Sequence, residues 1–334
     1  MDALVAAAAA PIPVATSLNN PAGLAVDSAG NVYIADSGNN RVIKVPAAGG
    51  TTTVVVPGLN NPAGVAVDTG GNVYYADSGN NQVKVTTPSG ATTVLATGLN
   101  NPAGVAVDSG FVYFADSGNN DVKRVPAAGG TPTVLAGGFN KPTGVAVDTS
   151  GNVFVTNTGA NTVSKVPAGG GSTTVVLASG LNRPTGVVVD SAGHLYISDS
   201  GNNRVVKLVA GAATITPVLT GLNNPAGIAR DSAGNLYIAD SGNNQALKLA
   251  AGTTTATPLV TGLNNPASLA VDAAGNLYIA DTGNNQVLML AAGTTTPKPL
   301  LTGLNNPTAV AVDSAGNVYI TDSGNNRVLM LPSG

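Results

Sequence analysis

The sequence contains no cysteine, no tryptophan and no glutamate, and only one histidine, His194, among its 334 residues. The absence of cysteine excludes disulfide bonds and thiolate metal sites. A single histidine cannot supply the three or four nitrogen or sulfur ligands of a typical zinc site. Charged residues make up 9% of the chain, far below the roughly 25% of ordinary globular domains. We therefore expect no cofactor and no metal site built from these ligands.

The charge balance excludes nucleic acid as a partner. The 14 Lys and Arg residues give a net charge of −3 and are scattered along the chain, so they do not form the basic face that displaces counterions from nucleic acid. No stretch approaches the ~20 apolar residues of a membrane span. Residues 1–10 are rich in alanine and are either a leader or the remnant of a trimmed secretory signal. On this basis we favour an extracytoplasmic or secreted location.

What the sequence does have is a repeat. The Leu-Asn-Asn-Pro-Ala-Gly type of segment recurs eight times at intervals of 40 to 42 residues, with its proline at Pro21, Pro62, Pro102, Pro142, Pro184, Pro225, Pro266 and Pro307. Such a constant period indicates one supersecondary unit copied along the chain. Within the second copy, residues 64–68, 73–77, 82–85 and 92–96 are short β-type runs separated by Gly, Asn, Asp and Pro. Four strands in about 41 residues are typical of a propeller blade.

The ends of the sequence indicate how the repeats are joined. Residues 11–16 align with the fourth strand of a repeat, whereas the chain ends on a third strand at residues 327–331. We therefore predict an all-β, eight-bladed β-propeller over residues 11–334, a single domain closed by pairing of the N-terminal strand with the last blade. Closure would remove strand edges that invite aggregation. We expect a monomer.

Segments such as Pro184-Thr-Gly-Val-Val-Val-Asp190 and Leu195-Tyr-Ile-Ser-Asp-Ser-Gly-Asn-Asn-Arg-Val205 resemble NHL repeats. The pattern is similar to the extracellular sensor domain of mycobacterial serine/threonine protein kinases and to designed propellers derived from it. Those sensor domains usually have six blades, so eight repeats are a departure. The resemblance implies a β-propeller and a sensor or protein-interaction role. It also implies that related lyases and lactonases use His, Glu and Asp around the channel mouth.

Most polar positions in the repeat have a structural interpretation. An Asp ends the first strand of every repeat, and an Asp ends the second strand of seven repeats. Asp before a turn accepts hydrogen bonds from the backbone N–H groups that follow, so we expect turn stabilisation rather than a ring of calcium ligands. The aromatic residue of each second strand is expected to pack between blades. His194 replaces an Asn between the first two strands, and we interpret it as an exposed turn residue.

Candidate ligand-binding residues are sought where the repeat is broken. Lys141 and Arg183 replace the second Asn of Leu-Asn-Asn-Pro, Asn157 replaces a second-strand Asp, and Arg230 replaces a Val. We expect the first three to make one sector of a loop face positive, and Arg230 to lie at the opposite end, where it would bind Asp or water. The candidate loop face also includes Asn61, Asn101, Asn224 and Asn265.

The function predicted from these observations is that of a non-catalytic binding or scaffold propeller, with a protein or small ligand on the loop face and no catalytic residues. Two alternatives stay open. One is a metal-dependent lyase or lactonase-like enzyme, and the other is an engineered or purely structural propeller without a ligand. Because propellers host many unrelated activities, the fold alone does not choose between them.

Overall fold

The computed structural model describes residues 10–47, 51–148, 150–170, 175–210, 212, 214–313 and 315–333. The predicted leader, residues 1–10, falls outside these residues except for its last position. The regular structure of these residues consists of β-strands and single 3-10 turns. Eight four-stranded antiparallel sheets confirm the predicted eight-bladed β-propeller. We call the sheets blades 1 to 8 in chain order.

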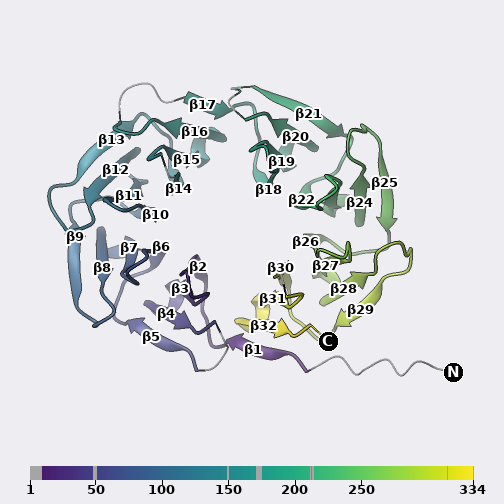
Figure 1. Cartoon of the computed structure of the whole chain (residues 1–334), viewed down its shortest axis with the longest axis horizontal. Coiled ribbons are helices and arrows are strands. Elements are labelled where there is room, and N and C mark those ends of the chain that lie inside the picture. The colour runs from purple at the N-terminus through teal and green to yellow at the C-terminus, as the bar shows by residue number, and fades with distance from the viewer. Residues whose placement is uncertain are drawn as a thin grey trace. The chain divides into compact units, whose positions relative to one another are not determined.

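Contacts divide the chain into two compact units, which are described separately. The first comprises residues 17–180 and holds blades 1 to 4. Successive strands of each blade lie side by side in Figure 1. The strands of this unit are β2 (Pro21–Val26), β3 (Val32–Asp36), β4 (Arg41–Val45) and β5 (Thr53–Val56); β6 (Pro62–Val67), β7 (Val73–Asp77), β8 (Gln82–Thr86) and β9 (Thr92–Ala96); β10 (Pro102–Val107), β11 (Phe111–Asp116), β12 (Asp121–Pro126) and β13 (Thr133–Gly137); and β14 (Pro142–Val147), β15 (Val153–Asn157), β16 (Thr162–Val166) and β17 (Val175–Ala178).

The second unit comprises residues 1–16 and 181–334 and holds blades 5 to 8. Its strands are β18 (Pro184–Val189), β19 (Leu195–Asp199), β20 (Arg204–Leu208) and β21 (Ile215–Thr220); β22 (Pro225–Arg230), β23 (Leu236–Asp240), β24 (Gln245–Leu249) and β25 (Ala256–Val260); β26 (Pro266–Val271), β27 (Leu277–Asp281), β28 (Gln286–Leu290) and β29 (Lys298–Leu301); and β30 (Pro307–Val312), β31 (Val318–Asp322) and β32 (Arg327–Leu331), with β1 (Ile12–Ala15).

Blade 8 is completed by the N-terminal strand, as predicted. Strand β1 pairs antiparallel with β32, with Ile12 opposite Met330 and Ala15 opposite Val328. In this sheet β1 occupies the place that β21, β25 and β29 take in blades 5, 6 and 7. Chain ends far apart in sequence thus share one sheet.

The turn between the second and third strands is built from the Asp-Ser-Gly-Asn-Asn sequence. In blade 2, residues Ser78–Asn80 form a 3-10 turn, and Asn81 adopts a left-handed conformation with φ of 56°. Asn tolerates that region better than most residues. The Ser78 hydroxyl donates to the carbonyl of Pro102 in the next blade at 2.5 Å. The same turn recurs as η1 (Ser37–Asn39), η2 (Ser78–Asn80), η3 (Thr158–Ala160), η4 (Ser200–Asn202), η5 (Ser241–Asn243), η6 (Thr282–Asn284) and η7 (Ser323–Asn325).

The core lies between neighbouring blades within each unit. Tyr74, Val83 and Leu95 of blade 2 pack against Val105 and Phe114 of blade 3, for example. The innermost strands approach so closely that a Cβ on Gly64 would lie 2.4 Å from the carbonyl oxygen of Ala103. Glycine is needed there because of this backbone approach. Among the described residues, no helix has the length and apolar character needed to cross a membrane.

Candidate functional site

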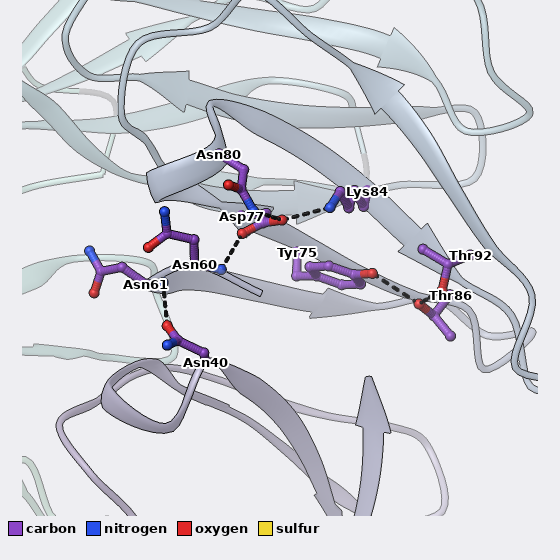
Figure 2. Close-up of polar contacts among 9 residues, drawn as sticks. All are labelled: Asn40, Asn60, Asn61, Tyr75, Asp77, Asn80, Lys84, Thr86 and Thr92. Carbon is purple, nitrogen blue, oxygen red and sulfur yellow. Dashed lines mark hydrogen bonds and ion pairs between the residues drawn. The ribbon is translucent and has the colours of Figure 1, made fainter. Parts of the chain in front are cut away.

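The aspartates that end the second strands are buried hubs of hydrogen bonds. Figure 2 shows Asp77, whose side chain is 0% exposed. Its Oδ1 accepts the backbone N–H of Asn60 at 2.7 Å, and its Oδ2 accepts Asn80 Nδ2 at 2.9 Å and Lys84 Nζ at 2.6 Å. The carboxylate therefore links the loop that precedes the first strand of the blade to the turn that follows the second strand. The equivalent buried residues are Asp36, Asp116, Asp199, Asp240, Asp281 and Asp322.

Asn157 takes this position in blade 4, where it was predicted as a ligand-binding residue. Its side chain is buried, and its Oδ1 accepts the N–H of Asn140 at 2.7 Å. It thus makes the structural contact that Asp77 makes, at the corner of blade 4 next to Lys141. The lysine that pairs with Asp77 in blade 2 has no counterpart beside Asn157, because Ser164 occupies the place of Lys84.

The second Asn of Leu-Asn-Asn-Pro uses its backbone to join consecutive blades. Asn61 has φ of 48°, and its N–H donates to Oδ1 of Asn40 in the preceding blade at 2.8 Å (Figure 2). Its side chain is exposed. The same donation joins Asn101 to Asn81, Lys141 to Asn120, Asn224 to Asn203 and Asn265 to Asn244. The exposed side chains of these predicted site residues stay candidate ligand contacts.

Lys141 and Arg183 hold the same left-handed conformation, with φ of 49° and 48°. Both side chains are exposed. Lysine and arginine enter this region less readily than asparagine. The two residues belong to different compact units, so the positive sector expected from them stays a prediction.

The aspartates that end the first strands hold the turn that follows and a tyrosine as well. Asp68 Oδ1 accepts the N–H groups of Gly70 and Asn72, and its Oδ2 accepts Asn72 Nδ2 at 2.8 Å and the Tyr74 hydroxyl at 3.0 Å. Burial acts to raise the pKa of Asp68, but these hydrogen bonds outweigh it and hold the pKa below its usual value. Burial and the adjacent Asp68 raise the pKa of Tyr74 to about 12.

This arrangement confirms that the aspartates stabilise turns and that the aromatic residues pack between blades, since Tyr74 is only 2% exposed. The hydroxyl contact was not foreseen. It recurs in the pairs Asp27–Tyr33, Asp108–Tyr113, Asp231–Tyr237, Asp272–Tyr278 and Asp313–Tyr319.

Blade 5 departs from this pattern. Asp190 Oδ1 accepts the N–H of Ala192 at 3.0 Å, the N–H of His194 at 2.9 Å and the imidazole Nδ1 of His194 at 3.0 Å. Among the described residues, none donates to Asp190 Oδ2, and Tyr196 makes no hydrogen bond to this carboxylate. Burial acts to raise the pKa of Asp190, but the N–H groups and the imidazole of His194 prevail and lower it to about 2. Asp190 is therefore ionised at neutral pH.

His194 lies in the turn between the first two strands, as predicted, but its side chain is partly buried instead of exposed. Its side chain is 23% exposed and pairs with a carboxylate that has an exposure of 10%. A single histidine held by an Asp four residues earlier was not among the predicted arrangements. That spacing was visible in the sequence.

The structure offers no cluster of metal ligands, but it does contain a cavity, as far as the described residues show. In the described part of the chain, no group of three or more His, Cys, Asp or Glu side chains could hold a metal ion. A cavity of about 430 Å³ lies between blades 1 and 2, lined by residues that include Asp27, Tyr33, Lys44 and Thr86. Of these, Thr86 bonds to Tyr75 and Thr92 through hydroxyl groups (Figure 2).

Comparison with known proteins decides the family. The model of the virginiamycin B lyase family matches residues 5–249, which is more than half of the chain. The chain belongs to the virginiamycin B lyase family. The NHL repeat model matches residues 263–288 and 304–329, which supports the predicted repeat type, whereas the likeness to kinase sensor domains stays an expectation. A search of curated proteins found no match.

Solved structures with the same fold include members of this family. Virginiamycin B lyase from Staphylococcus aureus has a TM-score of 0.60 and 14% identity over 97% of this chain and 99% of its own. A catalytically inactive variant of that enzyme with quinupristin has a TM-score of 0.54 and 16% identity, over 82% of this chain and 95% of its own. A structure of a nidogen/laminin complex has a TM-score of 0.51 and 25% identity, over 59% of this chain and 78% of its own.

Family membership overturns the prediction that the chain is not an enzyme. That prediction was based on the missing glutamate and the shortage of histidine. It treated the number of catalytic residue types as decisive, although one well-held base is enough for a proton transfer.

Proposed function

We propose that this protein is a lyase in which His194, held by Asp190, removes a proton from the substrate. The observation that carries the proposal is the 3.0 Å contact between His194 Nδ1 and Asp190 Oδ1. It involves the only histidine in the chain. Family membership supports lyase chemistry, and the pair supplies the base that such chemistry needs.

The geometry of the pair fixes the tautomer. An ionised carboxylate only accepts hydrogen bonds, so Nδ1 must carry the hydrogen that points to Asp190. In the neutral imidazole, Nε2 then has the free lone pair and is the basic atom. The negative charge of Asp190 also stabilises the imidazolium that forms when Nε2 takes up a proton, as in other carboxylate–histidine pairs.

In the reaction we propose, Nε2 removes a proton from the carbon next to the bond that breaks. The electron pair of that C–H bond becomes a double bond, and the leaving group departs with the electrons of the broken bond. Elimination inside a ring opens the ring without adding water, so the product keeps the mass of the substrate. A hydrolase would add the mass of one water molecule.

The substrate class is proposed from the relatives. Their names connect this family with virginiamycin B and with streptogramin B compounds, and quinupristin is bound to the inactive lyase. We therefore propose a ring compound of that type as the substrate. Quinupristin is the first compound to test.

The test is ring opening of quinupristin, followed by liquid chromatography and mass spectrometry. We expect a product of unchanged mass from the natural protein and a loss of roughly 10²-fold or more in rate for His194→Asn. Asparagine occupies this turn position in blades 1, 2, 4, 6, 7 and 8, and there it donates to the Asp four residues earlier in its own blade. The variant should therefore fold. Asn276→His is the matched control and should keep full activity.

Two results would overturn the proposal in different ways. No turnover of quinupristin or of virginiamycin B by the natural protein would remove the substrate class. Turnover by His194→Asn at the natural rate would remove the histidine as the base.

A further inference from the structure

Arg230 is a charged residue at a strand position that holds valine in the other seven blades. The last residue of the first strand is Val26, Val67, Val107, Val147, Val189, Val271 or Val312 in the other seven blades. Arg230 ends β22 of blade 6 and lies opposite Leu236, which in turn lies opposite Leu249. Residues opposite one another in adjacent strands point to the same face. The Arg230 side chain therefore lies on the same face of blade 6 as Leu236 and Leu249.

That face packs against blade 5. Leu236 and Leu249 belong to one apolar cluster with Val188 and Tyr196 of blade 5. In other blades the equivalent valine packs in the cluster that contains the preceding blade's tyrosine, as Val67 does with Tyr33 and Val271 with Tyr237. Arg230 thus brings a guanidinium to the face of blade 6 that packs against Tyr196 of blade 5.

The guanidinium has an unmet bonding requirement. Arg230 Nε is buried and has no hydrogen-bond partner among the described residues. A buried donor without a partner is costly, and more so when it is charged. The Nη2 atom lies 3.0 Å from the position that a Cβ on Gly234 would take, which places the guanidinium beside the turn between the first two strands of blade 6. His194 lies in the equivalent turn of blade 5.

Two cations, Arg230 and Lys207, lie at the junction of blades 5 and 6 together with two carboxylates that already accept other donors. Lys207 is opposite Tyr196 on the same face of blade 5, and its Nζ lies 5.2 Å from the centre of the Tyr196 ring. The nearby carboxylates are Asp190, which accepts three donors on Oδ1, and Asp231, which is held by Asn235 and Tyr237. No ion pair joins Arg230 or Lys207 to either of them within the described residues.

We propose that Arg230, assisted by Lys207, binds a small oxyanion at the junction of blades 5 and 6, with a carboxylate or a phosphate group as the ligand. The guanidinium offers a planar fork of N–H donors that matches two oxygens of such a group. The proposal does not depend on turnover, so it and the proposed function can each fail alone.

The test measures the melting temperature against increasing acetate or phosphate, with chloride keeping the ionic strength constant. We expect a saturable rise for the natural protein and loss of the saturable part in Arg230→Val, which corresponds to an affinity roughly tenfold or more weaker. Arg230→Val introduces the residue that the other seven blades hold, so it should fold. Lys298→Val removes the same charge from an exposed position of blade 7 and should keep the saturable rise.

Comparing the two titrations distinguishes the carboxylate from the phosphate as the preferred ligand. Arg230→Lys keeps the charge without the planar fork and should bind more weakly than the natural protein. The proposal is overturned if the natural protein shows no saturable rise with either ion, or if Arg230→Val responds as the natural protein does.

Discussion

Replacing Asp77 by Asn should destabilise the protein through a defined loss. The new side chain keeps one oxygen for the Asn60 N–H, but its NH₂ group faces two donors, Asn80 Nδ2 and Lys84 Nζ. Removing one partner of a fully buried ion pair costs about 3–5 kcal/mol. The Lys84 side chain is 17% exposed, so part of its charge can be solvated, and we expect about 2–3 kcal/mol here.

Blade 4 suggests a second variant that can be compared with Asp77→Asn. This blade has Asn157 at the position of Asp77 and Ser164 at the position of Lys84, so the carboxylate and the lysine are both replaced by neutral residues. Asp77→Asn combined with Lys84→Ser reproduces this arrangement in blade 2 and should recover about 1 kcal/mol relative to Asp77→Asn alone. Urea unfolding at pH 7, followed by circular dichroism, measures all three proteins. The reasoning fails if Asp77→Asn is as stable as the natural protein, or if the second substitution brings no recovery.

Two further predictions concern packing and pH. Gly64→Ala would place a Cβ 2.4 Å from the Ala103 carbonyl oxygen and 2.7 Å from the Val105 nitrogen, both of them backbone atoms. We expect this substitution to lower the free energy of unfolding in urea by about 3 kcal/mol or more. Ser268→Ala, at the equivalent position of blade 7, should lower it by less than about 1 kcal/mol, and equal effects of the two substitutions would contradict the close approach. The pKa values of Tyr74, Tyr113, Tyr237 and Tyr278 are raised to about 12, so their contribution to stability is complete below about pH 10 and is lost as pH rises toward 12. Spectroscopic titration should show these phenols ionising about two pH units later in the folded protein than in denaturant, and coincident curves would refute the contact with the aspartates. The depressed pKa of Asp68 acts in the opposite direction, because its stabilisation is present above about pH 4 and is lost in acid.

The strands could be predicted from the sequence because each is bounded by its own turn residues. The predicted strands at residues 73–77 and 92–96 agree with the structure, and the first strand of blade 2 begins two residues earlier than expected, at Pro62. Proline is acceptable there because it is the first residue of the strand and lies opposite Asp77 at the strand end. The role of β1 followed from counting strands in the last repeat.

The contacts that define the sites could not be predicted, because they join residues far apart in sequence. The Asn60 N–H reaches Asp77 across 17 residues, and the Asn61 N–H reaches Asn40 across 21. The position of Arg230 against blade 5 depends on strand register and on the packing of two blades. The His194–Asp190 contact is local, and it was missed because the pattern of a lone base held by a carboxylate was not searched for.

The most direct test of the central claim, that His194 is a base fixed by Asp190, is nitrogen NMR of the imidazole. The protein has one histidine, so its signals need no assignment. At a pH where the ring is neutral, we predict that Nδ1 carries the hydrogen and Nε2 does not, and that Asp190→Asn removes this preference. A neutral ring with its hydrogen on Nε2 in the natural protein would contradict the account.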